Sequence, residues 1–268
     1  MRAPETTASR RLLVVAHPGH ELRVHGWLEQ AKPEVWVLTD GSGHGAVSRV
    51  PSTRRVLAAA GVAPGPVFGR WSDREAYRIL LEGDTSAVGS IVDELAKALT
   101  DEQVELVAGD AFEGFNPVHD LCRLIIDLAV LVAETARGRS LKNCEFPLEA
   151  APGWEARPQA LRLQLDNGQL DRKLAVAHSY PELRGEVDRA LRSHGRDAFR
   201  NEWLSPVEPL ATLSRACGRV VPYERYGEGR VRLGYYTRVL RYREHFAPLA
   251  ERLVAAFGAG SARRRCAS

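Results

Sequence analysis

The sequence predicts an α/β fold in which a mostly parallel sheet lies between two layers of helices, a Rossmann-like three-layer sandwich. Short apolar runs typical of buried strands occur at 12–16, 35–38 and 104–108. Segments with helical periodicity follow these runs, and strands that alternate with helices form right-handed βαβ units. The second half of the chain is less regular, so we expect it to be rich in loops.

Each element is predicted from its apolar pattern and its end signals. Asn116 and Pro117 are typical of the N-cap and first turn of a long apolar helix, and Ser52 and Gly61 are expected to begin and end a shorter one. In chain order we expect a strand at 12–16, a helix at 21–30, strands at 35–38 and 67–69 with a helix at 52–60 between them, a helix at 86–99, a strand at 104–108, a helix at 117–136, a strand at 144–148, helices at 168–178 and 181–193, loops over 194–236 and a helix at 239–257.

Length and charge limit the class of protein. The chain has 268 residues and a net charge of only +3, which suits one sizeable domain, expected over 10–258 with disordered tails at 1–9 and 259–268. Its arginines are scattered apart from a run at 263–265, so we expect no nucleic-acid partner. No apolar stretch reaches the ~20 residues that a membrane span needs.

Cysteine usage indicates a reducing compartment. Cys122, Cys144, Cys217 and Cys266 are far apart in sequence and form no zinc-knuckle motif. We expect free thiols, with Cys122 in the core, and a cytoplasmic protein, because no signal peptide is visible.

Three histidines occupy the positions where open α/β sheets bind ligands. His17 and His20 follow the first strand, and His119 lies at the start of the helix after 104–108. The carboxyl ends of parallel strands meet at one rim of the sheet, so we expect these imidazoles to converge. Imidazole is a common zinc ligand, and three protein ligands leave a position open for water. The alternative is that these histidines have only a structural role.

Three motifs carry a resemblance to a known family. Ala16-His17-Pro18-Gly19-His20-Glu21 resembles the (A/P)HPDDE signature of the PIG-L/LmbE metal-dependent N-deacetylases, and 39–41 matches the family's TDG. Asn116-Pro117-Val118-His119 falls where the family has HPDH. The resemblance covers 10–135 and extends loosely beyond. It implies a metallohydrolase that removes an acyl group from an amine, usually on an amino sugar. By position, His17 and His119 match the family's metal-binding histidines and His20 its metal-binding aspartate.

The sequence also departs from the family at its catalytic positions. Gly19 replaces the aspartate that acts as general base, Asn116 replaces a histidine thought to help the developing oxyanion, and Val118 replaces a further aspartate. Loss of a general base typically slows a reaction about 10²–10⁴-fold, so another base must act or the chemistry is gone. The candidates for a replacement are acids near the same rim, namely Asp120, Glu113, Asp110 and Asp40.

Other residues receive secondary assignments. Asn116 is a candidate to hydrogen-bond an oxyanion, although N-capping is the simpler role. Glu21 is expected to brace the loop or to orient a ligand. Possible substrate contacts are His44, Arg49, His178 and the Tyr- and Arg-rich stretch 223–242, which forms either a sugar- or anion-binding wall or a packed cover.

These observations lead to one preferred function and its alternatives. We expect a zinc-dependent hydrolase, with other divalent metals as alternatives, that cleaves an N-acyl bond of an amino sugar or a related small metabolite with an atypical general base. The second hypothesis is a catalytically inactive or repurposed relative that binds a glycoconjugate, a metal or a partner enzyme. The third is a fold in which the histidines meet no metal.

Overall fold

One mixed sheet organises the chain. A computed structural model describes residues 9–43, 47–101, 103–149, 159–211, 213 and 221–265. Within these residues seven strands form a sheet in the order β3-β2-β1-β4-β5-β7-β6. The strands from β3 to β5 in this order are parallel, whereas β7 runs antiparallel to β5 and to β6. The strands are β1 (Arg10–Val15), β2 (Glu34–Thr39), β3 (Pro64–Trp71), β4 (Val104–Asp110), β5 (Lys142–Phe146), β6 (Leu161–Gln164) and β7 (Asn201–Pro206).

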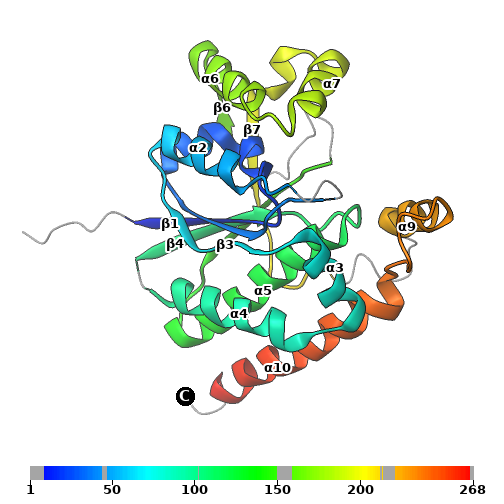
Figure 1. The fold of residues 1–268 in the computed structure, drawn as a ribbon. Coiled ribbons are helices and arrows are strands. Elements are labelled where there is room, and N and C mark those ends of the chain that lie inside the picture. Colours follow the sequence, from blue (N-terminus) through cyan, green and yellow to red (C-terminus); the bar gives the residue numbers. More distant parts are fainter. Residues whose placement is uncertain are drawn as a thin grey trace, which may run out of the picture.

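Helices cover both faces of this sheet (Figure 1). Helices α3, α4, α5 and α10 pack on one face, and α1, α2, α6 and α7 lie on the other. The helices are η1 (His20–Val24), α1 (His25–Ala31), α2 (Val50–Ala60), α3 (Asp73–Glu82), α4 (Thr85–Thr100), α5 (Pro117–Arg137), α6 (Asn167–His178), α7 (Arg184–His194), η2 (Arg196–Phe199), α9 (Pro222–Arg232), η3 (Tyr242–Phe246) and α10 (Ala247–Arg265). The predicted three-layer α/β fold is confirmed.

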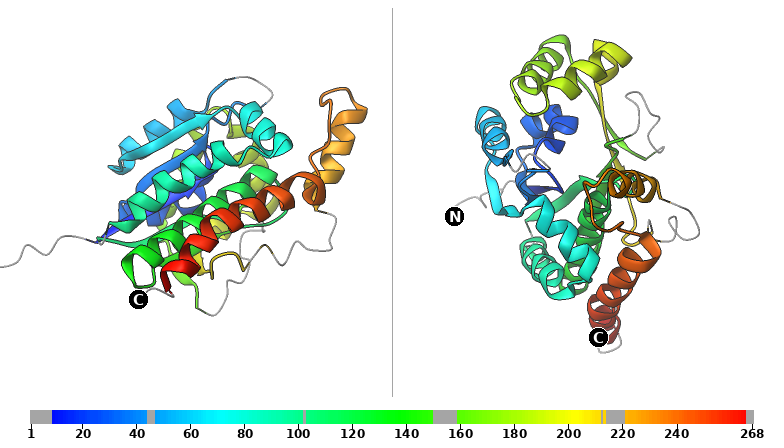
Figure 2. Two further views of the ribbon diagram at one scale, coloured as in Figure 1. Left: turned by 90° about the horizontal axis from the view of Figure 1, so that it is seen from below. Right: turned by 45° about the vertical axis from the view of Figure 1, so that its right-hand side comes forward.

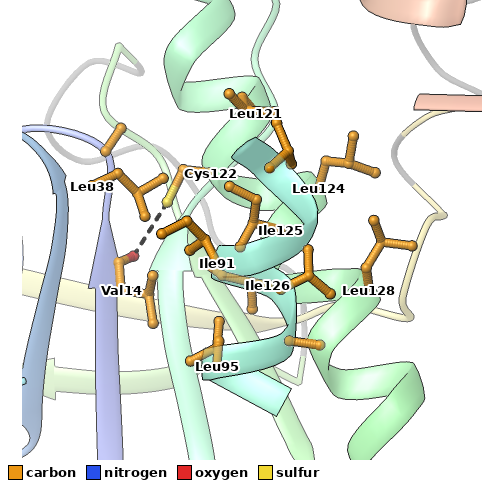
Figure 3. Close-up of a cluster of buried hydrophobic side chains, with 14 of the residues drawn as sticks. Val14, Leu38, Ile91, Leu95, Leu121, Cys122, Leu124, Ile125, Ile126 and Leu128 are labelled. Atoms are coloured by element: carbon orange, nitrogen blue, oxygen red, sulfur yellow. Dashed lines mark hydrogen bonds between the residues drawn. The ribbon is translucent and has the colours of Figure 1, made fainter. Parts of the chain in front are cut away.

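Strand β1 joins the two hydrophobic cores. Leu12 and Val14 face the core beneath α4 and α5, and Leu13 and Val15 face the opposite core, as the period-two alternation of a strand requires. Figure 3 shows the first of these cores, where the Cys122 thiol lies 3.7 Å from the carbonyl oxygen of Val14. Cys122 is therefore a core residue, as predicted, and burial raises the pKa of its thiol well above the usual value.

The C-terminal helix α10 belongs to the same helical layer as α5. Helix α10 lies alongside α5 (Figure 2), and it runs past residue 258, where the sequence placed the end of the domain. The described part of the chain has no helix that combines the length and hydropathy needed to span a bilayer.

Several local expectations are corrected. The helix expected at 21–30 is divided, because the amides of Gly26 and Trp27 donate to Glu202 of β7 and a new helix begins at His25. Ser52 does not begin α2, which starts at Val50 with a proline in its first turn.

The segment 194–236 is not simply loops. It contributes β7, which extends the sheet, and the helix α9. Helix α3 was not predicted, although Ser72 and Glu75 form a complete capping box at its start.

Candidate metal centre

Three imidazole rings meet at the carboxyl rim of the sheet. His17 follows β1, His20 begins η1, and His119 lies in the first turn of α5, which follows β4. Strands β1 and β4 are parallel neighbours, so the segments after them lie side by side. The ring centroids are 5.3 Å apart for His17 and His20, 5.1 Å for His17 and His119, and 4.6 Å for His20 and His119. The expected convergence of these rings is therefore present.

A carboxylate and a hydroxyl hold the outer nitrogen of His17. Nδ1 lies 2.7 Å from Oγ1 of Thr39 and 3.1 Å from Oδ1 of Asp73. Nε2 is buried and has no hydrogen-bond partner among the described residues. Burial lowers the pKa of His17 below its usual value, so the neutral ring is favoured at neutral pH. Burial alone would raise the pKa of Asp73, but the hydrogen bond with His17 brings it well below the usual value.

His20 has a similar arrangement on the other side of the cluster. Its Nδ1 lies 2.9 Å from Oδ2 of Asp110, the last residue of β4. The same oxygen accepts a hydrogen bond from the amide of Ala16 at 2.8 Å, and the Asp110 side chain is fully buried. Asp110 therefore links the two strand ends and fixes the orientation of the His20 ring. Asp110, one of the four candidates for a replacement base, has one oxygen engaged in that way, while its Oδ1 has no partner among the described residues.

His119 is the most isolated of the three rings. Its Nδ1 is buried without a hydrogen-bond partner in the described part of the chain. Burial, with smaller contributions from His20 and His17, lowers its pKa well below the usual value. Neutral imidazoles with unpartnered buried nitrogens match the donor chemistry of a zinc-type site, and carboxylates behind two of them match its usual support. As they stand, however, the described residues include no group of three or more His, Cys, Asp or Glu side chains arranged to hold a metal ion.

An apolar side chain covers the position of the missing aspartate. Gly19 has φ of 105°, a conformation that favours glycine, and a Cβ atom there would collide with Cδ1 of Leu183 and lie 3.8 Å from Cζ of Tyr180. Leu183 comes from the segment between α6 and α7. The chain thus has no carboxylate at this point, and a side chain there would require Leu183 to move.

Glu21 braces the loop that carries Gly19. Its carboxylate accepts the amide of Gly19 at 2.7 Å and the hydroxyl of Thr53 at 2.9 Å, and Tyr180 hydrogen-bonds the same hydroxyl. Burial raises the pKa of Glu21 above its usual value despite these hydrogen bonds. Of the two roles expected for Glu21, loop bracing is the one that its contacts show.

The three residues expected to act in catalysis all have contacts with backbone. Oδ1 of Asp120 accepts the amides of Glu113 and Gly114, both at 3.1 Å, and its buried Oδ2 has no partner among the described residues. Burial raises the pKa of Asp120 to about 8, although the amides of Gly114 and Glu113 act in the opposite direction. Glu113 accepts the amides of Leu148 and Glu149. Asn116 caps α5 by accepting the amide of Val118, as predicted.

The hydrogen bonds and ion pairs of the remaining described candidates do not involve the three rings. Asp40 accepts the amide of Ser42 and so organises its turn. Arg49 donates to the carbonyl of Gly41, and His178 contacts Leu174 and Asp188 on α6 and α7. His44 lies outside the described residues.

Asp73 is the functional candidate that sequence reasoning missed. It is the first residue of α3, directly after the capping residue Ser72, and Oδ2 accepts the amide of Gly43 at 2.7 Å while Oδ1 contacts His17. The capping box at 72–75 was the available signal, because it places a helix start, and thus Asp73, at the carboxyl end of β3.

Comparisons with known proteins give similarity in fold. No protein-family model matches the chain, and no curated protein gives a significant match. Among solved structures, a triple mutant of a deacetylase in the teicoplanin biosynthetic pathway has 16% identity and a TM-score of 0.50, covering 74% of this chain and 97% of its own. A zinc-inhibited form of teicoplanin deacetylase Orf2 has 14% identity and a TM-score of 0.46, covering 74% and 99%. At these identities the likeness concerns the fold alone.

Proposed function

We propose that this protein is a metal-dependent hydrolase that cleaves the N-acyl bond of an amino sugar or a related small glycoconjugate. The observation that carries the proposal is the convergence of His17, His20 and His119 at the carboxyl rim of the sheet. The similarity in fold to a deacetylase and the motif at 16–21 are consistent with it.

The three imidazoles would hold the ion. An all-imidazole donor set favours zinc over harder ions such as magnesium or calcium. When bound at such a site, a divalent ion lowers the pKa of water and polarises an acyl oxygen. Asp73 and Asp110 keep Nδ1 of His17 and His20 engaged, and this leaves the other ring nitrogen of each for coordination.

A proton acceptor other than residue 19 completes the proposal. The carboxylate of Glu113 accepts hydrogen bonds from the amides of Leu148 and Glu149, so we assign it the role of holding the segment after β5. Asp120 adjoins His119 and retains one buried oxygen with no partner among the described residues. We assign proton transfer to Asp120. Asn116 uses its side-chain oxygen as a helix cap and keeps its amide group as a donor for the acyl oxygen.

The decisive experiment combines metal analysis with hydrolysis. Purified protein loaded with zinc is expected to hold one ion per chain and to release amine from an N-acetyl amino sugar. His119→Ala should lose both properties. His178→Ala is the matched control, because this half-exposed histidine contacts only α6 and α7 in the described structure, and it should retain both.

The failures of this experiment have distinct meanings. A wild-type protein that binds no divalent ion at micromolar concentration rejects the metal site and the hydrolase together. Stoichiometric zinc without hydrolysis of any N-acyl sugar in a broad panel rejects the hydrolase and favours the repurposed relative that binds metal, a glycoconjugate or a partner enzyme.

A further inference from the structure

Arg230, near the end of α9, lies among tyrosine rings. Its guanidinium carbon is 4.0 Å from the ring centroid of Tyr235 and 5.8 Å from those of Tyr226 and Tyr236. Tyr236 also hydrogen-bonds Arg230. We call these four residues the Arg230 cluster. Rings beside a guanidinium attract its positive charge and keep water from its faces, so its in-plane N–H groups remain the donors for a ligand.

The charge of Arg230 is not neutralised within the described part of the chain. No ion pair joins Arg230 to a carboxylate there, and its buried Nε has no hydrogen-bond partner. The nearby Arg241 is the contrast, because Glu224, Glu228 and Glu244 all approach it within 4.0 Å. A partly buried arginine that lacks a carboxylate is a ready partner for an external anion.

The Arg230 cluster contacts α3, the helix that also carries Asp73. Tyr236 stacks obliquely on Tyr77, with 5.8 Å between ring centroids, and their side chains hydrogen-bond each other. Tyr77 lies on α3 one turn after Asp73, so the two side chains share a helix face. Asp73 in turn hydrogen-bonds His17. One face of α3 therefore carries both Asp73, which contacts His17, and Tyr77, which contacts the Arg230 cluster.

Part of the cluster is open to solvent. The exposed fractions are 56% for Tyr226 and 61% for Tyr235, and these are among the largest exposed apolar side chains of the described residues. A ring face that is accessible beside a cation offers apolar contact and charge together. This combination suits a ligand that has an apolar ring face and an anionic substituent.

We propose that the Arg230 cluster binds the anionic part of the substrate, a carboxylate or phosphate group, with the attached sugar ring against Tyr235 and Tyr226. The substrate is then an acidic glycoconjugate. This inference rests on the proposed function for identifying the ligand as the substrate, but binding to the cluster requires neither a metal ion nor hydrolysis.

The test is therefore equilibrium binding to metal-free protein. The probes for titration calorimetry are N-acetylglucosamine 6-phosphate, neutral N-acetylglucosamine and inorganic phosphate. Together they separate the contribution of the anionic group to binding from that of the sugar ring. The sugar phosphate is expected to bind at least about tenfold more tightly than either of the others, since a hydrogen-bonded charge pair adds to ring contact. Its affinity should fall as salt increases.

Variants assign the site. Arg230→Gln should abolish the preference for the phosphorylated sugar, and Arg230→Lys should restore only part of it. Tyr235→Ala should weaken the sugar phosphate and leave inorganic phosphate unchanged. Arg232→Gln is the charge-matched control on the exposed side of the same helix, and it should retain wild-type binding.

Each contrary result overturns the inference. Equal binding of charged and neutral sugars by the wild type rejects the anion site, as does an Arg230→Gln variant that retains the preference. Inorganic phosphate that binds as tightly as the sugar phosphate rejects the sugar contact. Circular dichroism of each variant verifies folding, and failure of hydrolysis alone would leave the binding result intact.

Discussion

Oδ1 of Asp73 lies 3.1 Å from Nδ1 of His17, although the two residues are 56 positions apart in the sequence. Thr39 approaches the same ring nitrogen, so both neighbours of Nδ1 are oxygen atoms. A proton on Nδ1 satisfies the carboxylate and leaves a lone pair on Nε2, which has no hydrogen-bond partner among the described residues. Asp73 thereby selects the tautomer in which Nε2 carries the lone pair.

Asp73→Asn should weaken zinc binding about 10–100-fold, because an amide holds the ring and its tautomer less firmly than a carboxylate. Competition against a chromophoric chelator measures the affinity. Asp93→Asn, on the exposed face of α4, is the control and should bind as the wild type does. Equal affinities for the wild type and the Asp73 variant would show that this carboxylate does not support a metal ligand.

Restoring the family's aspartate at position 19 should destabilise the protein. Gly19→Asp places a side chain against Leu183 in a conformation of positive φ, with overpacking alone costing about 1–3 kcal/mol. In a double variant, Leu183→Ala should remove the part of this loss in unfolding free energy that comes from overpacking. The part that comes from the backbone conformation at residue 19 should remain. Urea unfolding gives each free energy.

Gly138→Asp isolates the backbone cost in that experiment. Gly138 also has positive φ, of 65°, but a Cβ atom there meets no atom of the described residues within 4 Å. Gly138→Asp should lower the free energy of unfolding clearly less than Gly19→Asp does. Similar losses at the two glycines would exclude Leu183 as the obstacle.

The free energy of unfolding should depend on the ionisation of Asp120. Its pKa in the folded protein is about 8, raised by burial from a usual value of 3.8. Between these values the folded state binds more protons than the unfolded state, so stability falls as pH rises towards about 8. Asp120→Asn should remove this decline. The comparison uses urea unfolding of metal-free protein from pH 5 to 9, and parallel curves for both proteins would contradict the assignment.

A buried ion pair joins α6 to β7, the strand whose Glu202 also supports the start of α1. Lys173 donates to Glu202 at 2.8 Å, and Glu202 accepts the amides that begin α1. Lys173→Met should cost about 3–5 kcal/mol, because it leaves a buried carboxylate without its cation. The neighbouring Arg172 forms an exposed ion pair with Glu29, so Arg172→Met should cost about 0–1 kcal/mol. Thermal and urea unfolding distinguish the two, and equal losses would contradict the role of burial.

The fold was predictable where apolar patterns are strong. The strands β1, β2 and β4 and the helices α4 and α5 were predicted because the spacing of their buried apolar residues is clear in the sequence. Helix α9 was missed because Gly227 and Gly229 are typical of loops. Gly227 has a packing reason, since a Cβ atom there would lie 3.2 Å from Val239, so the glycine permits a close approach that the local sequence does not reveal.

Of the candidate site, only the three histidines were predictable. His17, His20 and His119 follow strands, and the rule that parallel strands end at one rim brings them together. Asp73 and Leu183 reach the same place from α3 and from the segment between α6 and α7. Their positions depend on how distant segments pack, and no local pattern in the sequence encodes such packing.

The sheet order also governs when the histidine cluster can exist during synthesis. Strand β4 lies beside β1 in the sheet, yet the chain makes β2 and β3 before it. A nascent chain that has folded only its first three strands presents two of the imidazoles and lacks the third. The ribosome must release residues beyond 119 before the rings can assemble, so the cluster is completed only after β4 and the start of α5 have emerged.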